Sequence, residues 1–311
     1  MRLLMLGCTG FVGRELVPVL LSAGHELTLI SRKSEKLFLQ QFTSSKQLSY
    51  LQADTTDKKS WQKESILSAI SQAEGVINLT GEPIAERRWT QKHCQKLESS
   101  RIDTTNSLVN AISELKRPPK VLINASAVGY YGTSPNSCFT ESSPSGEDFL
   151  AKLCKSWETA ALKKPSGTRL LIVRLGIVIG SDGGALGKML PVFKAGLGGP
   201  IGNGKQWMSW IHRTDLCTLI KQALENSAWS GVVNGVAPKP VRMAEFASEL
   251  GKSLSRPSLL NVPGPILKLL LGDGARVVLE GQNVASNHLS ELQFRYKYPE
   301  LSLALTAATK L

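Results

Sequence analysis

Three glycines close to the N-terminus, Gly7, Gly10 and Gly13, stand between a short apolar run and a helical pattern. At such a place glycine permits a tight turn, brings the backbone close to a diphosphate and lets the helix pack tightly on the strand. The N–H groups and the positive end of the helix dipole then face the phosphates. A simple strand–helix turn needs only one glycine, so the triplet favours a dinucleotide site. The residues expected to contact the cofactor here are Gly7, Thr9, Gly10, Phe11, Val12 and Gly13.

The end of the second apolar run indicates which dinucleotide is bound. An acidic residue at this point would bind the ribose of NAD, but the sequence has Ser31, Arg32 and Lys33. A carboxylate would repel a 2′-phosphate, whereas Ser31 can donate a hydrogen bond to it and Arg32 can form a forked, charge-assisted pair. The alternative is that Arg32 and Lys33 belong to a solvated loop. Together with the glycine turn, these residues predict NADP(H).

The next two apolar runs also end in polar residues or glycine. Asp54 follows the third run and could accept a hydrogen bond from the adenine amino group; the alternative is a turn aspartate bonded to its own backbone. Asn78, Thr80 and Gly81 follow the fourth run, where glycine would let the backbone pass close to the cofactor ribose. All four residues are therefore candidate cofactor contacts.

The elements that must position these residues alternate along the chain. Apolar runs without a polar face, typical of strands buried on both faces of a parallel sheet, are separated by helical patterns. This order predicts an α/β fold with a doubly wound, Rossmann-type parallel sheet. The predicted strands are Leu3–Leu6, Leu27–Ile30, Leu48–Leu51, Val76–Leu79, Val121–Ala125 and Leu170–Leu175.

The composition of the sequence changes after about residue 180, where glycines and then prolines become frequent. We therefore expect an NADP-binding domain over residues 1–180 and a smaller, C-terminal α/β substrate lobe over residues 181–311. Part of residues 210–236 is expected to return to the Rossmann sheet.

Several spaced stretches resemble the extended, epimerase-like short-chain dehydrogenases/reductases. The resemblance is closest to an atypical branch typified by the bacterial YfcH proteins, which also carries an old label as a cell-division inhibitor. It implies an NADP-binding Rossmann fold with a C-terminal substrate lobe, and names no substrate. The matching stretches include Gly81-Glu82-Pro83-Ile84-Ala85, Arg88-Trp89-Thr90, Ser100-Arg101-Ile102, Ser126-Ala127-Val128-Gly129-Tyr130-Tyr131-Gly132, Ser209-Trp210-Ile211-His212, Asn234-Gly235-Val236-Ala237-Pro238 and Gly281-Gln282.

The sequence departs from this family at the acid–base pair. Extended members use Tyr-x-x-x-Lys on the helix after the fifth strand, where the phenol transfers a proton and the lysine lowers its pKa and holds the nicotinamide ribose. Aligning Glu158 with the glutamate that usually follows the tyrosine puts Leu150 at the tyrosine position and Cys154 at the lysine position. Lys152 and Lys155 would point away from the position of Cys154. We interpret the pair as lost.

Other residues could replace the lost pair. Ser126, at the end of the fifth strand, could polarise a substrate carbonyl, or could be a strand-end hydroxyl bonded to backbone. Tyr131, beside Tyr130, could present a phenol, although an aromatic in such a loop is more often a pocket wall. His212 is titratable, but a lone histidine before a helix is more often a structural hydrogen-bonding group. Ser126 and Tyr131 are the predicted catalytic residues.

The chain has 311 residues with 37 Lys plus Arg and 25 Asp plus Glu, and its formal net charge is +12. The basic residues are spread along the sequence and aromatic residues are 6 %, so no nucleic-acid partner is expected. No apolar run reaches the roughly 20 residues of a membrane-spanning helix. The histidines and the five cysteines lack metal-ligand spacing. The cysteines and the absence of a leader pattern at the N-terminus predict reduced thiols and a cytoplasmic location.

Two functions remain open. The chain could be an NADPH-dependent oxidoreductase or epimerase that acts on a small carbonyl or hydroxyl compound. It could instead be an NADPH-binding scaffold or redox sensor whose lost Tyr-x-x-x-Lys pair marks lost or altered chemistry. An oligomer is possible, but no helix is apolar all round and would require one.

Overall fold

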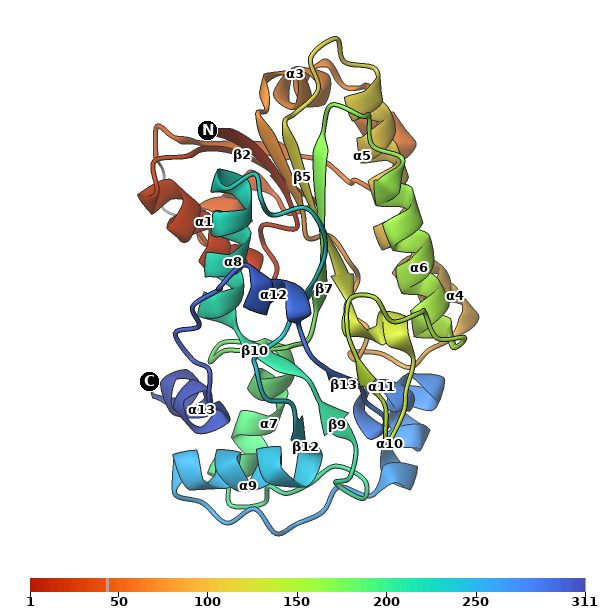
Figure 1. Cartoon of the computed structure of the whole chain (residues 1–311), viewed down its shortest axis with the longest axis vertical. Helices are drawn as coiled ribbons and strands as arrows, with labels where there is room; N and C mark the ends of the chain where they lie inside the picture. The colour runs from red at the N-terminus through yellow and green to blue at the C-terminus, as the bar shows by residue number, and fades with distance from the viewer. Residues whose placement is uncertain (43–44, 311) are drawn as a thin grey trace.

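A computed structural model describes residues 1–42 and 45–310 of the chain. Its centre is a seven-stranded sheet in the order β11-β7-β5-β4-β1-β2-β3 (Figure 1), in which every neighbouring pair is parallel. The Rossmann-type α/β fold predicted from the sequence is therefore confirmed, and each predicted apolar run overlaps one strand. The strands are β1 Arg2–Leu6, β2 Glu26–Ser31, β3 Leu48–Gln52, β4 Gly75–Asn78, β5 Val121–Ala127, β7 Arg169–Leu175 and β11 Gly231–Gly235.

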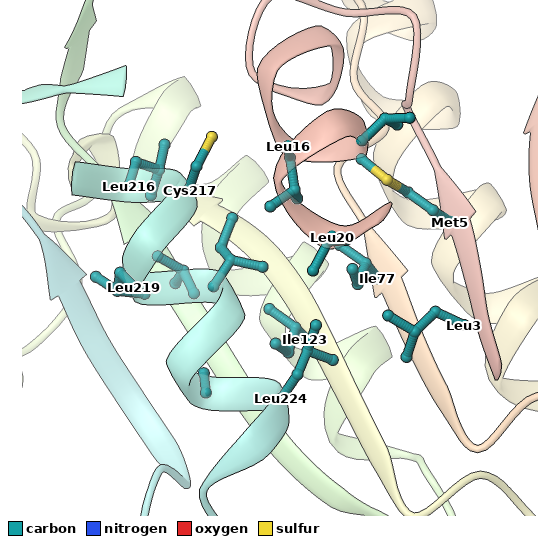
Figure 2. Close-up of a cluster of buried hydrophobic side chains, with 14 of the residues drawn as sticks. Leu3, Met5, Leu16, Leu20, Ile77, Ile123, Leu216, Cys217, Leu219 and Leu224 are labelled. Atoms are coloured by element: carbon teal, nitrogen blue, oxygen red, sulfur yellow. The ribbon is translucent and has the colours of Figure 1, made fainter. Parts of the chain in front are cut away.

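Helices cover both faces of the sheet, and strand β1 explains why its sequence is apolar throughout. Leu3 and Met5 enter the core under helices α1 (Gly13–Ser22) and α8 (Arg213–Glu225) (Figure 2), whereas Leu4 enters the core on the opposite face. Successive side chains of a strand point to opposite faces, so a strand between two helix layers must be apolar at every position. The opposite layer consists of α3 Glu64–Gln72, α5 Thr104–Ser113 and α6 Phe149–Leu162.

The smaller lobe begins where β7 ends. Gly176 joins β7 to β8 (Ile177–Ile179), which pairs in parallel with β10 (Trp210–His212), so the lobe lies at the carboxyl edge of the sheet (Figure 1). The chain then returns to the sheet through α8 and β11, and leaves it again. The division at residue 180 stays a prediction. The other elements of this lobe are α7 Gly184–Lys194, β9 Trp207–Met208, β12 Val241–Arg242, α9 Met243–Leu254 and α13 Leu301–Thr309.

Short elements form the loops around the carboxyl edge. Two of them flank α5 and β5: a π-helix, η2 (Ser99–Asp103), leads from α4 (Gln91–Glu98) into α5, and a 3₁₀ turn, η3 (Val128–Tyr131), follows β5. Within the described residues, no helix is long and apolar enough to cross a membrane. The remaining short elements are α2 Glu35–Leu39, η1 Lys58–Gln62, β6 Cys138–Phe139, α10 Gly264–Leu271, η4 Gly272–Ala275, α11 Arg276–Leu279, β13 Asn283–Val284 and α12 Asn287–Glu291.

The packing of α13 gives a direct test of the core of the smaller lobe. Leu305 is fully buried in this core, whereas Leu303 on the same helix is 54 % exposed. Leu305→Ala is expected to lower the free energy of unfolding by about 2–5 kcal/mol, because a cavity remains. Leu303→Ala is expected to change it by less than about 0.5 kcal/mol. Urea unfolding measures both values, and equal effects would contradict the described packing.

Candidate cofactor site

The glycine turn between β1 and α1 is built on close backbone contacts. Gly7 has φ +79°, and a Cβ atom there would lie 2.5 Å from the carbonyl carbon of Leu79. A Cβ atom on Gly13 would lie 2.4 Å from the carbonyl oxygen of Cys8. The N–H of Gly10 donates to the Gly7 carbonyl at 3.1 Å. Both end glycines therefore are required by the space between the end of β1, the end of β4 and the start of α1.

Backbone N–H groups of this turn are available to an anion. In the part of the chain that the structure describes, those of Phe11 and Val12 have no hydrogen-bond acceptor, and they stand directly before the N-terminus of α1. The Phe11 side chain points elsewhere: its ring lies 4.4 Å from the Arg213 guanidinium and contacts Gly183 of the smaller lobe. Phe11 can therefore serve a diphosphate only through its backbone.

The end of β2 gathers hydroxyl and basic groups. The Thr9 and Ser31 hydroxyl oxygens lie 3.3 Å apart, and the Lys33 N–H donates to the Ser31 hydroxyl at 3.3 Å. The Arg32 side chain is 65 % exposed, and its Nη2 atom lies 3.8 Å from the Glu82 carboxylate. This exposure leaves Arg32 free to turn toward a phosphate.

A hollow of about 550 Å³ adjoins Arg32. Lys63 adds a second cation to the wall of this hollow. The sequence did not single it out, because Lys63 is one of many lysines scattered along the chain. Asp54 also lines the hollow, and its Oδ1 accepts the N–H and hydroxyl of Thr56 at 3.0 and 2.8 Å, as the turn alternative predicts. The lining residues are Arg32, Gln52, Ala53, Asp54, Ser60 and Lys63.

Asn78 lies beneath the site rather than on its surface. It is fully buried, and its Nδ2 atom donates to Thr105 and Asn124 at 2.9 and 2.7 Å. Its Oδ1 atom accepts the N–H and the hydroxyl of Thr80 at 3.2 and 2.5 Å. The side chain of Asn78 therefore orients Thr80 at the end of β4, and only Thr80 and the neighbouring Gly81 remain at the surface.

The predicted catalytic hydroxyls of Ser126 and Tyr131 belong to one buried network. Ser126 donates to Glu158 Oε1 at 2.6 Å, and Arg174 forms a two-point ion pair with the same carboxylate at 2.8 Å. Arg174 also donates to the Tyr131 hydroxyl at 2.9 Å, which in turn donates to Asn234 Oδ1 at 2.7 Å. Burial raises the pKa of Tyr131. Ser126 thus bonds a carboxylate rather than backbone, and Tyr131 is buried in the network. The catalytic role of both residues stays a prediction.

Helix α6 carries no acid–base pair at the family positions. Leu150 is half-buried, and Cys154 is buried; burial raises the pKa of its thiol to about 12. The thiol therefore stays neutral at physiological pH and cannot replace a lysine cation. Lys152 and Lys155 are both exposed on the helix, as the helical geometry predicts.

No metal centre is present among the described residues, where no three His, Cys, Asp or Glu side chains could share an ion. His212 caps α8: its Nδ1 atom accepts the N–H of Thr214 at 3.2 Å. Burial lowers its pKa to about 4. This geometry agrees with the alternative that His212 is a structural hydrogen-bonding group.

Comparison with known proteins places these features in a family. The model of the NAD-dependent epimerase/dehydratase family matches residues 3–234, and that of a domain of unknown function, DUF1731, matches residues 262–308. The chain belongs to the NAD-dependent epimerase/dehydratase family. An Arabidopsis thaliana epimerase family protein, the chloroplastic SDR39U1 homolog, is 43 % identical over 97 % of this chain and 84 % of its own. The Bacillus subtilis epimerase family protein YfhF is 36 % identical over 98 % and 97 %.

Solved structures of two epimerase proteins agree with the fold. Human epimerase family protein SDR39U1, crystallised with NADPH, superposes with a TM-score of 0.87 at 35 % identity, over 99 % of each chain. The UDP-glucuronic acid 4-epimerase of Bacillus cereus superposes with a TM-score of 0.79 over 99 % of this chain and 98 % of its own, but at 17 % identity it supports the fold alone. The resemblance inferred from the sequence is therefore confirmed.

The cap formed by His212 predicts a pH dependence of stability. The folded pKa of about 4 lies below the ordinary value of 6.5, so the unfolded chain takes up the proton first as the pH falls. The contribution of His212 to the free energy of unfolding is therefore fully present above pH 6.5. About 2–3 kcal/mol of that free energy is lost as the pH falls to 4. His212→Asn keeps an N-cap acceptor and should lose less over this range. Urea unfolding at pH 7 and pH 4.5 compares the two proteins, and equal losses would refute the role of His212.

Proposed function

We propose that this protein binds NADP(H) and transfers hydride between it and a small carbonyl or hydroxyl compound. The observation that carries the proposal is the end of β2, where Ser31 and Arg32 stand in place of an acidic residue. A 2′-phosphate needs hydroxyl and guanidinium donors, whereas an acidic residue would repel it. The human relative crystallised with NADPH supports the same choice.

The residues present fit a dinucleotide along the carboxyl edge of the sheet. The N–H groups of Phe11 and Val12 would hold the diphosphate, because they are without an acceptor in the described structure. Thr9, Ser31 and Arg32 would hold the adenine ribose and its 2′-phosphate, and Thr80 with Gly81 would line the path toward the smaller lobe. The bound nicotinamide supplies the hydride chemistry. These residues follow the ends of β1, β2 and β4. In open α/β sheets, ligands bind in the crevice outside the carboxyl ends of the strands.

A second function, an NADPH-binding scaffold or redox sensor, is favoured by one observation. Leu150 and Cys154 hold the positions of the acid–base pair, and the hydroxyls of Ser126 and Tyr131 are hydrogen-bonded in the core. A reductase with this site needs a proton from water or from the substrate itself. A scaffold needs no proton at all.

Turnover separates the two functions. The full chain would be incubated with NADPH and a panel of aldehydes, ketones and quinones, and the absorbance of NADPH would be followed. An oxidoreductase oxidises NADPH faster with at least one of these compounds than without any. Tight NADPH binding with no acceleration by any compound would exclude the oxidoreductase function for these classes and leave the scaffold.

Cofactor choice gives a separate prediction. NADPH is expected to raise the melting temperature more than NADH does, because only NADPH has a 2′-phosphate that Ser31 and Arg32 can bind. Arg32→Asp should reverse this order, since the carboxylate repels the phosphate and can bind a ribose hydroxyl. Lys36→Asp, on the nearby helix α2, changes charge equally and should keep the original order. Equal shifts with both cofactors in the unmodified protein would contradict NADP(H) selectivity.

We also propose a compartment that keeps thiols reduced, such as the cytoplasm. The five cysteines, at positions 8, 94, 138, 154 and 217, are free. Three of them, Cys8, Cys154 and Cys217, are buried. Free thiols of this kind persist where glutathione keeps them reduced.

A further inference from the structure

Arg101 lies between α4 and α5, on the path from β4 to α5. It belongs to the π-helix η2, a rare form of helix that is frequent at functional sites. Its Nη2 atom donates to the Glu82 carbonyl at 2.9 Å, and its Nη1 atom donates to the Leu97 carbonyl at 3.1 Å. The guanidinium is therefore held in a fixed orientation by backbone on two sides.

The guanidinium occupies the space beside the lost lysine position. Its central carbon lies 5.3 Å from the centre of the Trp157 ring, and Trp157 stands three residues after Cys154, on the same face of α6. Arg101 also lowers the pKa of the Cys154 thiol against the larger effect of burial, as expected for a cation next to that thiol. A cation thus reaches the Cys154 position from η2 rather than from α6.

The Arg101 guanidinium also packs closely on Gly81. A Cβ atom on Gly81 would lie 2.9 Å from the central carbon and from Nη2 of the guanidinium. Gly81 is exposed and follows β4 at the carboxyl edge, where the proposed cofactor runs. The guanidinium therefore lies directly against the backbone that would face the cofactor ribose.

The charge of Arg101 is left without an acidic partner. Among residues 1–42 and 45–310 it forms no ion pair, because the Glu82 carboxylate turns to Arg32 and offers Arg101 only its carbonyl. Burial lowers its pKa, although a guanidinium stays protonated in proteins. A guanidinium has five N–H donors; those of Arg101 bond the carbonyls of Glu82 and Leu97 and the Ser100 hydroxyl, and the remaining donors can bond a ligand.

We propose that Arg101 replaces the missing lysine as the cation that holds the ribose of the nicotinamide half of the dinucleotide. This rests on the proposed binding of NADP(H). The guanidinium donates hydrogen bonds to the ribose hydroxyls, and it binds without taking part in proton transfer, because it does not lose its proton.

Two ligands that differ by one ribose test this assignment. Adenosine 2′-phosphate 5′-diphosphate ends at the diphosphate, and 2′-phospho-ADP-ribose continues to the second ribose without nicotinamide. Calorimetry on the full chain should show that the added ribose tightens binding about tenfold, the usual effect of hydrogen bonds to a charged group. Arg101→Met should remove this gain, and Arg101→Lys should restore part of it.

Two control variants separate the ribose contact from other effects. Arg32→Met should weaken both ligands by the same factor and keep the gain from the ribose. Arg88→Met removes another arginine that donates to a carbonyl, at Leu269, and should change neither ligand. If Arg101→Met weakens both ligands equally, Arg101 has only a structural role and the proposal is wrong.

The unmodified protein provides a test that does not depend on the folding of a variant. Equal affinity for the two ligands would show that no protein group holds the second ribose, and would overturn the role of Arg101 while NADP(H) binding stands. Failure to bind NADPH itself would instead refute the proposed function, and the role of Arg101 with it.

Discussion

A buried ion pair between Arg174 and Glu158 connects the elements on which the carboxyl edge of the sheet depends. Both side chains are less than a tenth exposed, and their two-point contact joins β7 to α6. Ser126 extends the contact to β5, and Tyr131 with Asn234 extends it to β11. Such a pair adds little over apolar packing, but removing one partner leaves a buried charge and costs about 3–5 kcal/mol. Its effect is to fix one arrangement of these four elements.

This network bears on the predicted catalytic role of Ser126 and Tyr131, which stays a prediction. A hydroxyl that polarises a substrate must have a donor or acceptor free at the cleft. Ser126 and Tyr131 use theirs on Glu158, Arg174 and Asn234, and each is almost fully buried. The hydroxyls of Ser126 and Tyr131 also connect the ends of the strands, so the network braces the edge of the sheet beside the proposed cofactor site.

The sequence was sufficient for features that depend on near neighbours in the chain. The apolar runs predicted the strands, because burial on both faces leaves no polar position, and the glycine spacing predicted a turn that admits no Cβ at Gly7 or Gly13. The partners of Ser126 and Tyr131 could not be predicted, since they lie 32 and 103 residues away in sequence. Arg101 belongs to a stretch that resembles the family, so the sequence pointed to it. The orientation of its side chain depends on a π-helix, which no sequence periodicity predicts.

The proposed replacement of the lysine by Arg101 would separate two tasks that a single residue performs in related enzymes. A lysine beside a catalytic tyrosine binds the ribose and lowers the pKa of the phenol. With leucine at position 150 there is no phenol to adjust, so only the binding task remains, and a guanidinium suits it because its donors are rigid and its charge is permanent. Cys154, whose raised pKa keeps the thiol neutral, adds no charge at the former lysine position. A chain with this arrangement can retain full cofactor binding after losing the proton relay, which is why cofactor affinity by itself does not establish turnover.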